Sequence, residues 1–91
     1  MSKGEIYYIR TDNKVEGKKV ERSDYDAHIR YLEGVAKSRY FKGGGFKNKD
    51  GGMIIFKADS MEEAKLICDG DPLINRKLYT YELVEWEIVI G

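Results

Sequence analysis

Apolar and polar positions follow two kinds of pattern along this chain, and the order of these patterns predicts the fold. Stretches rich in Ile, Tyr, Met and Phe are typical of β-strands, whereas apolar residues at every third or fourth position are typical of an amphipathic helix. Strand patterns cover residues 5–10, 40–46, 53–58 and 79–90, and helix patterns cover residues 24–37 and a segment that begins at Ser60. The order βαββαβ predicts a ferredoxin-like α+β fold, with both helices on one face of an antiparallel sheet.

The helix patterns carry signals for where each helix begins. Either residue of the Ser23–Asp24 pair is suited to cap the helix over residues 24–37, and His28 falls on the apolar face of that helix. Residues 60–63 (SMEE) match a capping box, in which the first and last side chains bond each other's backbone N–H. Residues 71–72 (Asp-Pro) predict a further short turn, because Asp caps helices and Pro fits the first helical position.

Consecutive glycines interrupt the strand pattern over residues 40–46. Glycine inside a strand marks a bulge or a place where another group approaches the backbone closely, so Gly44 and Gly45 are candidate ligand contacts. Residues 48–52 have the composition of a turn and predict a hairpin between the flanking strands. Residues 11–22 contain almost no apolar side chains and predict a long polar loop.

Apolar residues occupy both sides of the predicted strands. Val84, Trp86, Ile88 and Ile90 share one side of the last strand, and both sides are apolar in the strand over residues 53–58. Helices on one face of the sheet would leave the other apolar face open to water. A second copy of the chain is the simplest cover, so we expect a homodimer.

Size and charge narrow the class of protein. The 91 residues make one domain, residues 1–91, and 16 basic residues balance 16 acidic ones. Balanced charge gives no general attraction to nucleic acid or to anionic membranes. RNA-recognition modules share the βαββαβ order, but Gly51 and Met53 stand where such a module presents aromatic side chains to bases. No apolar run approaches the roughly 20 residues of a membrane helix.

Cys68 is the only cysteine and His28 the only histidine. A single cysteine forms no intrachain disulfide, and the N-terminal residues have no apolar stretch behind a basic start, so we expect a cytoplasmic protein. One histidine, one cysteine and no clustered carboxylates give no metal-ligand spacing. The glycines also lack the spacing of a phosphate-binding loop, so we expect neither a metal nor another cofactor.

An ordered set of motifs resembles the YciI-like (YCII-related) family. The motifs are HIRYL at 28–32, Gly44–Gly45, DSMEEA at 59–64, Asp71–Pro72 and VEWEI at 84–88. The resemblance covers nearly all of the chain after the first polar loop. It implies a dimeric α+β barrel with a small pocket between sheet and helices. His28 and Asp71 take the positions of the histidine and aspartate suspected as the catalytic pair of that family.

The chemistry of these two residues fits the resemblance. Imidazole gives or takes a proton near neutral pH, and a carboxylate partner holds its tautomer and stabilises its charged form. Equally, His28 has the pattern of a hydrogen-bonded core residue and Asp71 that of a helix cap. Tyr25, one helical turn before His28, and Tyr8 are candidate hydroxyls for the pocket, although tyrosines more often pack in a core with the polar end bonded.

The resemblance implies a lyase or isomerase without a cofactor, because family members include a dehydrochlorinase of chlorinated aromatic breakdown. The alternative is a non-catalytic ligand-binding or structural dimeric module. The chain departs from the family pattern at Phe46, where Pro is common, and at Tyr25, where many members have an arginine suited to an anionic substrate. A cavity at His28 that Asp71 also reaches favours the enzyme, and a filled, dry site favours the alternative.

Overall fold

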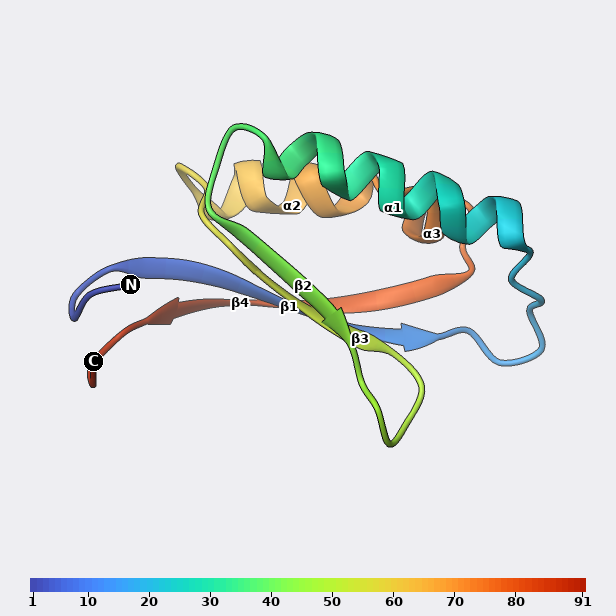
Figure 1. Cartoon of the computed structure of the whole chain (residues 1–91), viewed down its shortest axis with the longest axis horizontal. Coiled ribbons are helices and arrows are strands. Elements are labelled where there is room, and N and C mark those ends of the chain that lie inside the picture. Colours follow the sequence, from blue (N-terminus) through green and yellow to red (C-terminus); the bar gives the residue numbers. More distant parts are fainter.

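Three helices lie on one face of a four-stranded antiparallel sheet in this computed structural model, which describes residues 1–91 (Figure 1). The elements are β1 (Ile6–Lys14), α1 (Arg22–Ala36), β2 (Phe41–Gly45), β3 (Gly52–Phe56), α2 (Met61–Asp69), α3 (Pro72–Asn75) and β4 (Tyr79–Glu87). The strand order is β2-β3-β1-β4. The ferredoxin-like α+β fold expected from the sequence is therefore confirmed. None of the helices combines the length and the hydropathy of a membrane span.

β1 is longer than its apolar pattern predicted. Its second half pairs with β4 as far as Lys14, which lies opposite Tyr79. Residues 11–14 were expected in a loop because their side chains are polar, but the backbone bonds of a partner strand hold them extended. The long polar loop is therefore reduced to the connection over residues 15–21.

Hydrogen bonds in the first turns determine where the helices begin. α1 begins earlier than expected, because the Asp24 carboxylate accepts the backbone N–H of Glu21 at 2.9 Å. α2 begins where expected, since the Ser60 hydroxyl accepts the backbone N–H of Glu63 at 3.1 Å. The capping box is not closed, because the Glu63 carboxylate accepts the N–H of Asp59 rather than that of Ser60.

The core lies between the sheet and the helices. It consists of Tyr8, Leu32, Ile54, Phe56, Ala64 and Cys68. No helix covers the opposite face of the sheet (Figure 1), and on it Val84, Trp86 and Met53 are 51%, 40% and 42% exposed. Val84 and Trp86 share that face as expected, whereas Ile88 and Ile90 lie beyond the end of β4.

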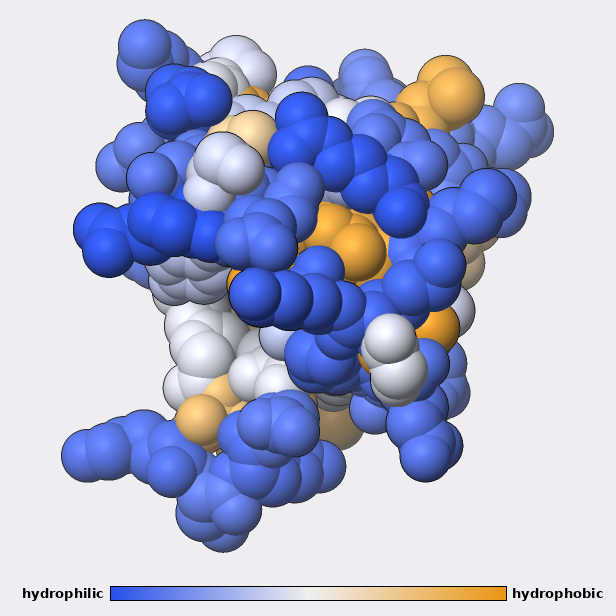
Figure 2. Space-filling view, turned by 90° about the vertical axis from the view of Figure 1, so that its right-hand side faces the viewer, coloured by the Kyte–Doolittle hydropathy of each residue, from blue (hydrophilic) through white to orange (hydrophobic).

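The end of the molecule at which α1 begins has a different surface. Figure 2 views the molecule from this end, and hydrophilic side chains cover most of it around a small apolar area. The exposed apolar side chains of the sheet belong instead to the face away from the helices.

Cys68 is 1% exposed, and burial raises the pKa of its thiol to about 11. In the unfolded chain a thiol ionises near pH 8.5, so the neutral thiol stabilises the fold below that pH and this contribution is lost as the pH rises toward 11. We expect the free energy of unfolding to fall by about 3 kcal/mol from this group alone. Urea unfolding across this range, repeated with Cys68→Ala, checks the prediction. An equal loss in the variant would contradict it.

Candidate active site

Alternation along β1 places Tyr8, Arg10 and Asp12 on the face beneath the helices. Arg10 is 1% exposed and Asp12 is 8% exposed. The Arg10 guanidinium donates to both oxygens of the Asp12 carboxylate, with Nε–Oδ1 and Nη2–Oδ2 distances of 2.6 and 3.0 Å. Strand residues two apart point the same way, so the pairing of β1 with β4 through these positions places the two side chains together for a bidentate ion pair.

Asp71 connects this ion pair to His28. It is completely buried at the N-cap of α3, where Oδ1 accepts the backbone N–H of Leu73 at 3.0 Å. Its Oδ2 lies 2.8 Å from Arg10 Nη2. His28 Nδ1 lies 2.9 and 2.7 Å from Oδ1 and Oδ2. A carboxylate has about four acceptor sites, so Asp71 caps α3 and bonds both Arg10 and His28 at once.

Electrostatics keep Asp71 ionised. Burial opposes ionisation, but the hydrogen bond from His28 and the guanidinium of Arg10 outweigh it and hold the pKa of Asp71 below its ordinary value. An ionised carboxylate only accepts hydrogen bonds, so His28 Nδ1 must carry the hydrogen between them. In the neutral imidazole, Nε2 is then unprotonated and able to accept a proton.

A cavity of about 410 Å³ lies between α1 and the hairpin formed by β2 and β3. His28 and Asp12 line this cavity, together with Tyr25, Gly44 and Gly45. The glycines of β2 bound this space differently, since an added Cβ would find open room at Gly45 but would press on the Ile54 side chain at 3.3 Å at Gly43. The structure therefore brings three of the four predicted ligand contacts to one cavity with the predicted histidine.

The fourth predicted contact, Tyr8, does not line this cavity. Its side chain is 4% exposed and packs in the core against Phe56, with ring centroids 6.1 Å apart. Tyr25 occupies a very different position, since it is 51% exposed and its ring centroid lies 5.9 Å from that of His28. Tyr25 is therefore at the mouth of the cavity, and Tyr8 belongs to the core.

Sequence reasoning missed Arg10 and Asp12. The apolar pattern of the first strand ends at Arg10, so the alternation through Tyr8, Arg10 and Asp12 was not followed. A signal was present, because opposite charges at alternate strand positions are placed to pair on one face. No group of three His, Cys, Asp or Glu side chains is placed to hold a metal ion.

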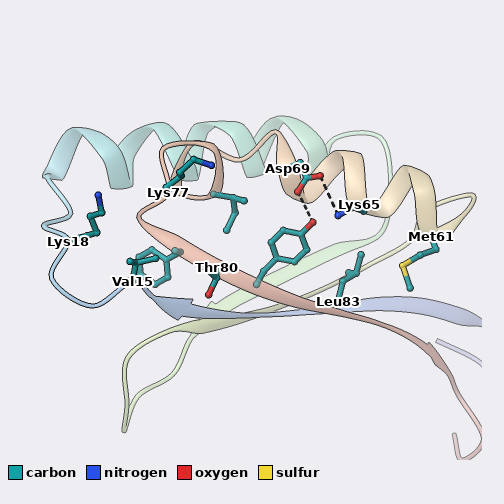
Figure 3. A pocket seen from close by; sticks show the side chains of 11 residues that line it. Val15, Lys18, Met61, Lys65, Asp69, Lys77, Thr80 and Leu83 are labelled. Atoms are coloured by element: carbon teal, nitrogen blue, oxygen red, sulfur yellow. Dashed lines mark hydrogen bonds and ion pairs between the residues drawn. The ribbon is translucent and has the colours of Figure 1, made fainter.

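A second, wider cavity of about 750 Å³ lies between α2 and the edge strand β4 (Figure 3). Lys65 and Asp69 reach toward it from α2, and the Tyr81 hydroxyl donates to Asp69 at 2.6 Å. Burial and this hydrogen bond raise the pKa of Tyr81, so the hydroxyl stays protonated. No histidine lines this cavity. The His28 cavity is the better candidate for proton transfer.

The fold and this cavity together define a ferredoxin-like α+β protein with a histidine–aspartate pair at a small-molecule-sized cavity. The model of the YCII-related domain matches residues 6–87, and the chain belongs to this family. A similar solved structure is 5-chloro-2-hydroxyhydroquinone dehydrochlorinase from Burkholderia phenoliruptrix AC1100 in complex with 2,5-dihydroxybenzoquinone. Its TM-score is 0.74 at 22% identity, over 89% of this chain and 93% of that chain, which establishes a shared fold. No curated protein matches the chain.

Proposed function

We propose that this protein is an acid/base enzyme without a cofactor, a lyase or isomerase that acts on a small ring or carbonyl compound. One observation carries this proposal: His28 Nδ1 lies 2.7 Å from the buried Asp71 carboxylate, and the same imidazole lines a cavity. Carboxylate, imidazole and open space in this order are what general acid/base catalysis requires.

The proposed step begins with His28 Nε2, which takes a proton from a substrate carbon or hydroxyl. Asp71 stabilises the imidazolium that forms, and Arg10 keeps that carboxylate ionised. Return of the proton to another substrate atom completes an isomerisation. Departure of a leaving group with its bonding electrons completes an elimination. The similar solved structure is that of a dehydrochlorinase, which supports elimination as the reaction class.

His28→Gln tests this function directly. We expect kcat/KM to fall about 10²–10⁴-fold, because glutamine cannot accept and return a proton. The substrate is found first by screening chlorinated hydroquinones and other small enolisable compounds against the wild type. Arg30→Gln, on the exposed side of the same helix, is the matched control and should retain activity. Equal turnover by His28→Gln and the wild type would contradict the proposal.

The structural role of Asp71 supports a second candidate function, that of a non-catalytic ligand-binding module. This carboxylate caps α3 and neutralises Arg10 whether or not His28 takes part in chemistry. The same cavity then serves a non-catalytic ligand-binding module. Ligands that bind at the cavity but are recovered chemically unchanged, with binding that survives His28→Gln, would favour this second function over the enzyme.

We also propose that two copies of the chain pair through the uncovered sheet face. The half-exposed Val84, Trp86 and Met53 support this pairing, since exposed apolar side chains on one face of a sheet favour a partner. Trp86→Glu is expected to turn a dimer into a monomer, because it places a charge in the apolar contact. Light scattering after gel filtration measures this, with Arg30→Glu on α1 as control. A monomeric wild type, or a dimeric Trp86→Glu, would contradict the pairing.

A further inference from the structure

The His28 cavity has an unusual balance of charge in its walls. Two carboxylates, those of Asp12 and Glu33, are among its lining residues, and no lysine or arginine is. His28 is the only basic side chain that lines it. An anionic ligand in the cavity would therefore lie near acidic side chains, with no lysine or arginine in the lining to neutralise its charge.

Arg10 does not change this balance. Its side chain is 1% exposed, and its guanidinium bonds are made to Asp12 and Asp71. One guanidinium thus faces two buried carboxylates. The cluster of Arg10, Asp12 and Asp71 therefore carries a net negative charge whenever His28 is neutral. A buried charge acts on a neighbouring cavity more strongly than a solvated one, because little water screens it.

The remaining walls suit a flat, apolar ligand. Tyr25, Phe41 and Tyr79 present aromatic rings, while Gly43 and Gly45 on β2 leave bare backbone on the opposite side. A Cβ added at Gly45 would meet only the Gly51 carbonyl oxygen, at 4.0 Å, so space is open at that position. Aromatic rings and exposed peptide planes together favour a planar ring compound.

We propose that the His28 cavity selects uncharged or cationic planar ring compounds and excludes carboxylates of the same size. This charge selection rests on the proposed small-molecule function and names its substrate class. The buried cluster of Arg10, Asp12 and Asp71 supplies most of the repulsion through its net negative charge, and the exposed Glu33 adds a weaker, solvent-screened share. Tyr25 at the cavity mouth supplies no cation to offset either of them.

Ligands matched in shape but not in charge test the proposal. The probes are 4-hydroxybenzamide, 4-hydroxybenzoate and 4-hydroxybenzylamine, each titrated into the wild-type protein while the backbone amide signals of Gly43–Gly45 and Gly51 are followed by NMR. We expect the uncharged amide and the cationic amine to bind at least about tenfold more tightly than the carboxylate, which is the factor a single unfavourable charge contact of ordinary size produces.

A second experiment adds a positive charge at the cavity mouth and measures whether carboxylate binding becomes tighter. Tyr25→Arg should strengthen 4-hydroxybenzoate binding by about tenfold or more, because it supplies the missing cation, whereas the uncharged Tyr25→Gln should not. Glu33→Gln should reduce the discrimination against the carboxylate only slightly, about twofold, because Glu33 is exposed and water screens its charge.

The possible outcomes distinguish a failure of the charge selection from a failure of the proposed small-molecule function. Carboxylate binding to the wild type as tight as amide binding, or no gain in Tyr25→Arg, would overturn the charge selection and leave the small-molecule site standing. Failure of every probe to shift the cavity amides would count against the small-molecule site itself, and the charge selection would fall with it.

Discussion

Arg10→Met is expected to lower the free energy of unfolding by about 3–5 kcal/mol, because it leaves buried carboxylates without their counter-charge. Arg10, Asp12 and Asp71 are 1%, 8% and 0% exposed, so water cannot replace the lost partner. Methionine keeps much of the side-chain length, which limits any loss that comes from an empty cavity. Urea unfolding of the wild type and the variant measures the difference.

An exposed ion pair supplies the control for this prediction. Arg22 lies 3.3 Å from Asp26, and the Arg22 side chain is 89% exposed. Arg22→Met should cost no more than about 1 kcal/mol, as is usual for ion pairs at the surface. Losses of equal size in the two variants would show that burial of the Arg10 pairs has no special effect.

At acidic pH the difference in free energy of unfolding between the wild type and Arg10→Met should become smaller. The folded-state pKa of Asp71 lies below the ordinary value of about 3.9, so ionised Asp71 contributes stability above that pH. The contribution is lost as the pH falls through the folded-state pKa, where Asp71 takes up a proton. Wild type and variant should therefore approach each other in stability below about pH 4. A deficit that stays constant in acid would contradict the role of Asp71.

Asp71→Asn is expected to reduce kcat/KM of the folded protein by about 10²–10⁴-fold. Asparagine keeps an oxygen that can cap Leu73, but its amide group brings a hydrogen-bond donor to the side where Arg10 Nη2 already donates. The same amide can donate to His28 Nδ1, which moves the ring hydrogen to Nε2 and removes the base from the cavity.

Steady-state kinetics on the substrate identified by screening measure this loss. Asp69→Asn is the matched control, because Asp69 is an exposed neighbour that bonds Tyr81 and has no contact with His28. A similar loss of kcat/KM in both variants would indicate a general disturbance of the segment around residues 69–71. Full activity in Asp71→Asn would remove the carboxylate from the mechanism.

The order of elements could be predicted from the sequence because each element except the end of β1 carries its own pattern. The apolar spacing of α1 placed His28 on the inner face, and the Asp-Pro step at residues 71–72 indicated the start of α3. The bond between His28 and Asp71 joins residues far apart in the chain, so no local pattern contains it. Only the resemblance to a family suggested that these two side chains act together.

The buried ion pair could not be read from composition in the same way. Arg10 and Asp12 are polar residues at the edge of an apolar run, where solvent exposure is the ordinary expectation. Their burial depends on β4, whose pairing extends β1 to Lys14 and carries both side chains beneath the helices. Tyr8 was placed in the pocket for a related reason, because sequence alone does not say which part of the inner sheet face lies under open space.

The tautomer of His28 tests the central claim most directly. Because His28 is the only histidine, the imidazole nitrogen signals of the uniformly ¹⁵N-labelled protein are assigned without ambiguity. With the ring neutral, we predict a protonated Nδ1 and an unprotonated Nε2, the arrangement that an ionised Asp71 imposes and that an acid/base enzyme requires. A ring with the hydrogen on Nε2, or one that averages between the two tautomers as free imidazole does, would contradict the His28–Asp71 pair as the acid/base device of this protein.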